Sequence, residues 1–191
     1  MGDHKDHNVP DVHKDDTDDP ETRARQVCLR LLTLAPRTRA QLADALRKRG
    51  IPDPVAVGVL DRYADAGLID DAAFARAWVE SRHYSRGLAG RALAAELKQR
   101  GVDSGEIRDA IEELGPDAEV ATARKLVAQQ LAGTRGQPAQ ARTRRLAGML
   151  ARKGYPPGLA FRVIREAMEA EGADGALGEE PHFDDPDAFT E

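Results

Sequence analysis

Three copies of one pattern of leucines, a cation and a glycine organise the apolar positions of this chain. The copies are Leu42, Leu46, Arg49 and Gly50; Leu93, Leu97, Arg100 and Gly101; and Leu146, Leu150, Lys153 and Gly154. Leucines four residues apart share one helical face, a cation in the last turn complements the helix dipole, and glycine ends a helix in the left-handed conformation. The glycines are 51 residues (50 to 101) and 53 residues (101 to 154) apart. The pattern therefore predicts one helical unit repeated three times.

Each repeat is predicted to contain three helices, because apolar residues recur at spacings of three and four between turn and capping signals. The predicted helices are 21–35, 38–49 and 53–66; then one that starts at the caps Asp70 and Asp71, 88–100 and 103–114; then 117–131, 138–153 and 156–170. β-branched and aromatic residues never alternate over a useful length, so no strand is predicted. The expected fold is all-α, with three tandem three-helix repeats at 21–70, 71–115 and 116–170 in an elongated, curved array.

Charge divides the chain into a basic body and two acidic ends. Residues 1–20 carry seven Asp and two Lys, and residues 171–191 carry eight acidic groups without Lys or Arg. The overall charge of −5 therefore leaves +8 on residues 21–170. Both ends lack periodic apolar residues, which predicts disordered tails. Three histidines in the first tail could hold a metal ion weakly, but a solvated low-complexity tail is the preferred interpretation. These are His4, His7 and His13.

The composition of the chain bears on the cellular compartment in which the protein is expected. No run of about eighteen apolar residues is present and the N-terminus is acidic, so neither a membrane span nor a signal peptide is predicted. The single cysteine, Cys28, allows no intramolecular disulfide and suits a small buried thiol. The expected protein is cytoplasmic, monomeric and without a membrane partner.

No enzyme signature is found, so no catalytic residue, metal or cofactor is expected. The sequence contains no glycine-rich phosphate loop, no paired histidines on a helix, and no Ser or Cys beside a positioned His. His83 is expected to cap carbonyls at a helix end or to lie in solvent. Asp70 and Asp71 precede an apolar helix, which favours capping. Phe74 and Trp78, one turn apart, are interpreted as core residues.

Lys and Arg residues at the ends of the second helices are the better functional clue. A row of such cations along the repeats would suit a polyanion or an acidic protein groove, whereas single cations can simply complement the helix dipole. Arg142, Arg144 and Arg145 differ, because they open a helix and so oppose its dipole. The candidate contact residues are Arg47, Lys48, Arg49, Arg82, Arg86, Arg91, Lys98, Arg100, Arg142, Arg144, Arg145, Arg152 and Lys153.

One run of residues carries a family resemblance. It consists of Gly67-Leu68-Ile69-Asp70-Asp71, Phe74-Ala75, Trp78-Val79 and Arg82, followed by Gly87, Gly90, Leu93, Glu96-Leu97-Lys98 and Gly101-Val102. With this run the chain resembles the RecX family, regulators of the bacterial recombinase RecA. The resemblance spans about residues 23–170, and that family's tandem three-helix repeats agree with the layout predicted from periodicity.

The resemblance implies a non-enzymatic regulator. Proteins of this kind bind the RecA–DNA filament, lie in its groove and restrain its growth, which lowers ATP hydrolysis, strand exchange and co-protease activity. It implies roles in DNA repair, recombination and the SOS response. Arg82 and Lys98 match family pattern positions and are carried over as contacts; the family supplies no catalytic residue. The acidic tails and the slightly acidic central repeat depart from the usual pattern.

Two other functions stay open from the residues alone. The first is a helix-turn-helix protein that binds duplex DNA directly, although the third helices of the first two repeats carry few base-contacting residues. The second is a passive helical scaffold, which would leave the basic body unexplained. Contact with single- or double-stranded DNA through that body is compatible with the leading interpretation. The acidic tails could also cover the basic body and weaken non-specific DNA binding.

Overall fold

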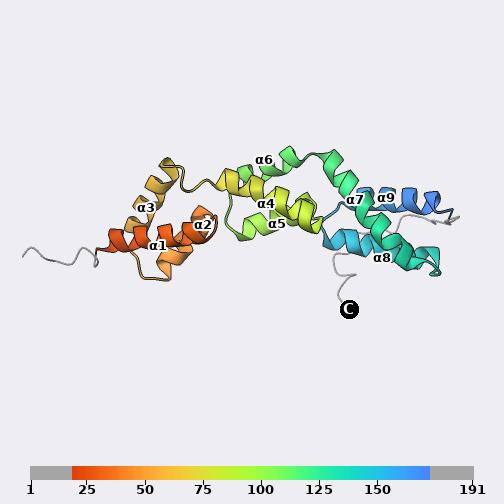
Figure 1. Ribbon diagram of the computed structural model, residues 1–191, viewed down its shortest axis with the longest axis horizontal. Helices are drawn as coiled ribbons and strands as arrows, with labels where there is room; N and C mark the ends of the chain where they lie inside the picture. Colours follow the sequence, from red (N-terminus) through yellow and green to blue (C-terminus); the bar gives the residue numbers. More distant parts are fainter. Residues whose placement is uncertain (1–18, 173–191) are drawn as a thin grey trace, which may run out of the picture. The chain divides into compact units, whose positions relative to one another are not determined.

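The computed structural model describes residues 19–172. This part of the chain folds into nine α-helices and one short 3-10 helix, without a strand (Figure 1). The all-α prediction is therefore confirmed. Most of both acidic segments that were expected to be disordered, residues 1–18 and 173–191, lies outside the described residues. None of the helices in residues 19–172 is long and apolar enough to cross a membrane.

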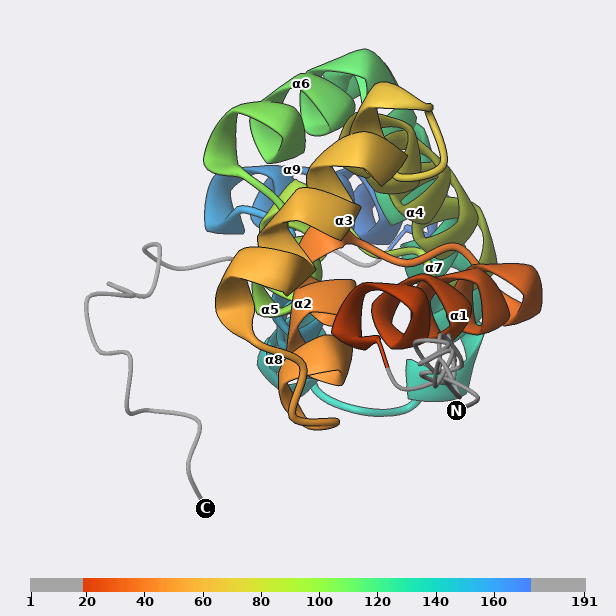
Figure 2. The same cartoon turned by 90° about the vertical axis from the view of Figure 1, so that its left-hand side faces the viewer.

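The first repeat contains α1 (Pro20–Leu34), α2 (Arg39–Arg47) and α3 (Asp53–Asp65), which pack against one another (Figure 2). The pair Thr38 and Gln41, spaced as in a capping box, starts α2: Thr38 Oγ1 accepts from the Gln41 amide and Gln41 Oε1 accepts from the Thr38 amide, both at 3.2 Å. The dipeptide Asp53-Pro54 suggests Asp53 as the N-cap of α3, but the N-cap is Pro52 and Asp53 is the first helical residue. The core of this repeat contains Ala24, Cys28, Leu42, Leu46, Val59 and Leu60.

The middle repeat contains α4 (Asp71–Arg86), α5 (Gly90–Gln99) and α6 (Ser104–Leu114). Asp70 caps α4 by accepting from the Ala73 amide at 2.7 Å. Asp71 acts elsewhere, because its Oδ1 accepts from the Arg39 amide, at the start of α2, at 2.9 Å. Both acids therefore satisfy helix N-termini, as the capping interpretation required, but they serve two different helices.

The third repeat contains α7 (Pro116–Leu131), the 3-10 helix η1 (Ala132–Thr134), α8 (Ala139–Arg152) and α9 (Pro157–Ala170). Helix α9 packs against both α7 and α8. The amphipathic pattern explains this arrangement, since the apolar sides of the three helices form one core. Its most deeply buried side chains include Val127, Leu146, Leu150, Tyr155, Val163, Ile164 and Met168.

The repeated motif has the predicted geometry in all three copies. Its six leucines are at most 1% exposed. The glycines Gly50, Gly101 and Gly154 have φ values of 70°, 76° and 87°, which end their helices in the left-handed region. In the first copy the Ile51 amide donates back to the Leu46 carbonyl at 3.2 Å, and in the third the Tyr155 amide does so to Leu150 at 3.1 Å. The apolar residue after each glycine is buried, as this helix-ending motif favours.

The chain forms two compact units, and the middle repeat contributes to both. The first unit comprises Met1–Ala75 and Lys98–Glu106, and the second comprises Arg76–Leu97 and Ile107–Glu191. Each unit thus contains one complete outer repeat together with part of the middle repeat. The proposed repeat boundaries at residues 70 and 115 stay a prediction.

The helices that carry the repeated motif are α2, α5 and α8. In the first unit the turn after α5 packs on the start of α2, and in the second unit the turn after α8 packs on the start of α5. In the first unit Thr38 Oγ1 donates to the Arg100 carbonyl at 2.6 Å, and a Cβ on Gly101 would overlap Ala40. In the second unit the Ala89 amide donates to the Lys153 carbonyl at 2.9 Å, and a Cβ on Gly154 would overlap Ala92. The motif glycines at 101 and 154 are therefore needed for close packing as well as for helix termination.

Candidate functional site

The cations that end α2 are bound by their own helix. Lys48 Nζ lies 2.6 Å from Asp44 Oδ2, and Arg47 pairs with the other oxygen of the same carboxylate. These partners lower the pKa of Asp44, with the Lys48 hydrogen bond the largest cause. Arg49 donates to the Ala45 carbonyl at 2.9 Å. Only Arg49 therefore fits the alternative in which a cation complements its helix end, while Arg47 and Lys48 are held by a side chain of the same helix.

Arg82, the residue carried over from the family pattern, lies over an aromatic ring between α4 and α5. Its guanidinium carbon is 4.1 Å from the centre of a Trp78 ring. The Trp78 indole N–H donates to Glu96 Oε2 at 2.8 Å, and Arg82 Nε lies 3.7 Å from the same oxygen. Trp78 is half-buried, so it is less internal than the core interpretation expected. One quarter of the Arg82 side chain is exposed, so this cation is partly accessible although it is held against the ring.

Arg86 and Arg91 lie on either side of the turn that joins α4 to α5. Both residues are exposed, and neither guanidinium makes a hydrogen bond or ion pair with any residue in 19–172. Lys98, at the end of α5, is likewise exposed and unpaired within the described part of the chain. Arg100 is half-buried and supplies its carbonyl to Thr38. Among the candidate residues, the middle repeat therefore offers three cations that are unpaired within residues 19–172 and one held against a ring.

Lys153 has a structural task that the sequence did not indicate. Its Nζ donates to the Arg86 carbonyl at 2.6 Å, and its own carbonyl accepts from Ala89. Tyr155 donates to the Gly87 carbonyl at 3.1 Å, and burial raises the pKa of this phenol to about 12. These contacts attach the turn after α8 to the turn between α4 and α5. We therefore place Lys153 in this junction.

His83 is also part of the junction between the middle and third repeats. It is fully buried, with Nδ1 2.9 Å from the Leu88 carbonyl and Nε2 2.8 Å from the Thr122 hydroxyl. The carbonyl can only accept, so Nδ1–H donates to it, while Nε2 forms its hydrogen bond with the Thr122 hydroxyl. His83 binds a carbonyl of the turn after α4 and not one of the helix's own last carbonyls, so the capping expectation is not met, and the solvent alternative is wrong because the ring is buried. Both ring nitrogens are occupied, so the ring has no free position with which to act as a base.

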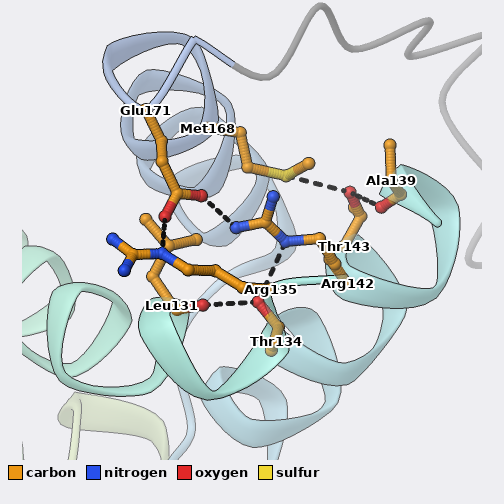
Figure 3. Close-up of polar contacts among 8 residues, drawn as sticks. All are labelled: Leu131, Thr134, Arg135, Ala139, Arg142, Thr143, Met168 and Glu171. Atoms are coloured by element: carbon orange, nitrogen blue, oxygen red, sulfur yellow. Dashed lines mark hydrogen bonds and ion pairs between the residues drawn. The ribbon is translucent and has the colours of Figure 1, made fainter. Parts of the chain in front are cut away.

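The arginine cluster at the start of α8 divides into one buried and two exposed residues. Arg142 is the buried one, and its side chain points toward Glu171 (Figure 3). Arg142 is 7% exposed. Its Nε donates to Thr134 Oγ1 at 2.9 Å, and its terminal nitrogen pairs with Glu171. Arg135 Nε binds the other oxygen of that carboxylate at 2.9 Å. The expectation that Arg142 is a surface contact is therefore corrected: Glu171 explains why a cation is placed where it opposes the helix dipole.

The carboxylate of Glu171 is held between two guanidinium groups. Hydrogen bonds from Arg142 and then Arg135 lower the pKa of this carboxyl below its ordinary value. Thr134 completes the arrangement by donating to the Leu131 carbonyl at 2.6 Å. The contact joins the end of α9 to η1 and to the first turn of α8. Sequence reasoning could not find it, because 29 residues separate Arg142 from Glu171.

Arg144, Arg145 and Arg152, which we call the α8 arginine group, face outward. All three are exposed, and their guanidinium groups have no hydrogen-bond or ion-pair partner among residues 19–172. Their surroundings are strongly basic, because residues 120–165 contain ten Lys and Arg and no Asp or Glu. Lys125 and Arg162 of the same segment are also exposed and unpaired within residues 19–172, and sequence reasoning did not single them out. The absence of Asp and Glu over these 46 positions is the sequence signal from which Lys125 and Arg162 could have been identified as unpaired.

A pocket lined partly by carboxylates, a further candidate binding site, lies in the first unit. It has a volume of about 340 Å³, and burial raises the pKa of both Asp71 and Glu106 in its wall. Asp70 and Asp71 are already bound to helix amides, as described above. No group of three metal-ligating side chains occurs in the part of the chain that the structure describes. The pocket is lined by Arg39, Ala64, Gly67, Ile69, Asp70, Asp71 and Glu106.

Family models match all three repeats in chain order. The first, second and third three-helix domains of RecX match residues 24–62, 70–111 and 117–164. The chain belongs to the RecX family. The regulatory protein RecX of Thermobifida fusca is 62% identical over 157 residues, which cover 82% of this chain and 85% of that protein. The one from Streptomyces coelicolor is 58% identical over 163 residues, covering 85% and 87%.

Solved RecX structures share the fold of this RecX-family chain. The crystal structure of RecX from Lactobacillus salivarius superposes with a TM-score of 0.73 at 18% identity, covering 77% of this chain and 96% of that one. A second crystal structure, of a regulatory protein RecX, gives a TM-score of 0.69 at 23% identity, covering 78% and 72%. At these identities the likeness concerns the fold alone, so the assignment of contact residues depends on the geometry described above.

Proposed function

We propose that this protein is a non-enzymatic regulator that binds the RecA nucleoprotein filament and mainly inhibits the recombinase, ATPase and co-protease activities of RecA. The observation that carries the proposal is the match of all three RecX domains, together with relatives of about 60% identity that are named regulatory proteins. RecA acts on DNA in the bacterial cytoplasm, in repair, recombination and the SOS response. We place this protein there too, as a monomer.

Unpaired cations are the residues that we propose contact the filament. The α8 arginine group has first place, because nothing in the described chain neutralises it and no carboxylate lies nearby in sequence. The middle repeat adds cations near the α4–α5 turn and at the end of α5. A partner's phosphates or carboxylates can bind such groups without first breaking an internal ion pair. The proposed contacts are the unpaired Arg86, Arg91, Lys98, Arg144, Arg145 and Arg152, together with Arg82, whose guanidinium is already held by Trp78 and Glu96.

Cations already held by internal partners are assigned a smaller part in binding. Those at the end of α2 (Arg47, Lys48 and Arg49) share one carboxylate and one helix carbonyl. Arg100, Arg142 and Lys153 belong to contacts between elements of the fold. The prediction that cations of the three repeats form one row stays a prediction.

A pelleting experiment tests filament binding. RecA is assembled on single-stranded DNA with a non-hydrolysable ATP analogue, sedimented, and the bound protein measured across a concentration series. Saturable co-sedimentation that needs both RecA and DNA is the expected result. The variant R144E/R145E/R152E should bind much more weakly, whereas reversal of Arg47, Lys48 and Arg49 should have a smaller effect. No pelleting above that seen with DNA alone would contradict the proposal.

Direct binding to duplex DNA is the second candidate function, and the carboxylate-free segment 120–165 favours it. Binding through phosphates weakens steeply as salt rises, because each contact releases counterions. A gel shift with random duplex at 50 and 200 mM salt measures this dependence. Strong retention of one duplex sequence at the higher salt would indicate a helix-turn-helix type of DNA recognition in place of filament regulation.

A further inference from the structure

We propose that the acidic C-terminal segment, residues 173–191, binds the α8 arginine group of its own chain and competes there with polyanionic partners. This deepens the proposed function, on which it rests for the identity of the competing partner. The occupant is therefore a part of this chain, and the surface is the outward side of α8 around Arg145 and Arg152.

The starting point of the segment supports the proposal. Glu171 is already fixed between Arg142 and Arg135, so the chain leaves the described part next to the first turn of α8 (Figure 3). Arg145 follows Arg142 by three residues, which places their Cβ atoms about 5–6 Å apart on a helix. The acidic segment therefore begins beside Arg142 and Arg135, about one helical turn from Arg145 of the α8 arginine group.

The lengths also match. Arg152 lies ten residues beyond Arg142, which corresponds to about 15 Å along a helix. An extended chain advances roughly 3.3 Å per residue, so about five residues beyond Gly172 can span that distance. Carboxylates occur within or just beyond this reach at Asp174, Glu179 and Glu180. No strained conformation of the segment is needed for contact.

Charge complementarity selects this segment over the N-terminal one. Residues 173–191 contain seven carboxylates and no Lys or Arg, whereas residues 1–18 contain two Lys among their acidic groups. The α8 arginine group has no carboxylate partner in residues 19–172. A tethered acidic segment acts at an effective concentration in the millimolar range, which lets several weak ion pairs compete with a free ligand.

The test compares two full-length variants with the same change in charge. One replaces six tail carboxylates (D174N, E179Q, E180Q, D184N, D185N and D187N), and the control replaces six at the other end (D3N, D6N, D11N, D15N, D16N and D18N). Their affinities for a labelled single-stranded oligonucleotide are measured at 50 and 300 mM salt. We expect the first variant to bind roughly tenfold more tightly than the control at low salt, as when about one tenth of the parent chain is binding-competent. Equal affinities would overturn the proposal.

A spin label at residue 178 tests the contact without any DNA. The variant G178C provides the thiol, because the natural Cys28 is buried. Salt-sensitive broadening of the Arg145 and Arg152 amide signals, absent from α1 and lost in R145E/R152E, is expected. No broadening on α8 would overturn the proposal. If no form of the protein bound the oligonucleotide, only the DNA part of the proposed function would fail, and the label would still decide whether the contact forms.

Discussion

The first and third repeats carry the same motif, yet their turns and cations have different surroundings. The turn glycines Gly50 and Gly154 share the left-handed conformation. A Cβ on Gly50 would meet no described atom within 4 Å, whereas one on Gly154 would meet the Ala92 backbone. The cations after α2 are bound locally, while the α8 arginine group has no such partner in residues 19–172. A shared motif therefore fixes helix termination, and the surroundings decide what else each position does.

The position four residues before the first motif leucine shows the same contrast. In the first two repeats this position is occupied by Thr38 and Ala89. Each donates a hydrogen bond to a carbonyl in the turn after the motif helix of the next repeat. In the third repeat it is occupied by Arg142, which binds Glu171 instead. Helix α8 also begins three residues before this position, whereas α2 and α5 begin one residue after it. At this position the third repeat, the last of the three, therefore makes a contact within itself, between Arg142 and Glu171.

The largest expected effect separates the two glycines. Gly154→Ala should lower the free energy of unfolding by about 3 kcal/mol, because it combines a left-handed alanine with overlap against Ala92. Gly50→Ala should cost about 1 kcal/mol, since only the backbone conformation is unfavourable. Urea denaturation of both variants measures the difference. Equal losses would show that the packing at Gly154 does not contribute.

A second comparison separates the cations by function. R144E/R145E/R152E should weaken filament or oligonucleotide binding by about 30- to 100-fold, which corresponds to about 2–3 kcal/mol. The change should leave stability within about 0.5 kcal/mol, because these side chains are exposed and unpaired in the described chain. R47E/K48E/R49E is the matched control. A greater loss of binding in that control would reverse the proposed ranking of the two repeats.

Arg142 should behave in the opposite way to its neighbours. Arg142→Ala should destabilise the protein by about 2 kcal/mol, because a buried residue loses hydrogen bonds to Thr134 and Glu171. Since the pKa of Glu171 is lowered in the folded state, its contribution is present above the unfolded carboxyl pKa and disappears as pH falls through the folded value. Urea titrations between pH 3 and 6 should show this acid dependence in the parent and less of it in Arg142→Ala.

Tyr155 gives the smallest expected effect. Tyr155→Phe should cost about 1 kcal/mol at neutral pH, because it removes the hydrogen bond to the Gly87 carbonyl. Burial raises the Tyr155 pKa from 10 to about 12, so the unfolded phenol ionises first as pH rises. Stability should therefore fall between pH 10 and 12 in the parent, and less steeply in the variant. Parallel pH profiles for the two proteins would contradict the assigned contact.

Local sequence signals predicted the helices well, because each depends on neighbouring residues. The spacing of Leu146 and Leu150, the Thr38 capping box and the glycine after each motif helix are all of this kind. Contacts between distant positions were not predictable in this way. Lys153 with the Arg86 carbonyl and Arg142 with Glu171 depend on how the helices pack. The candidate cations could therefore be named from sequence, but their division into internal and outward groups required the structure.

We propose that this RecX-family protein regulates RecA by binding its filament. The most direct test is the DNA-dependent ATP hydrolysis of RecA, titrated with this protein at ratios well below one per RecA. We predict inhibition at such ratios, because each bound molecule would affect many RecA subunits, and weaker inhibition by R144E/R145E/R152E. Unchanged hydrolysis up to equimolar amounts of the parent protein would contradict it.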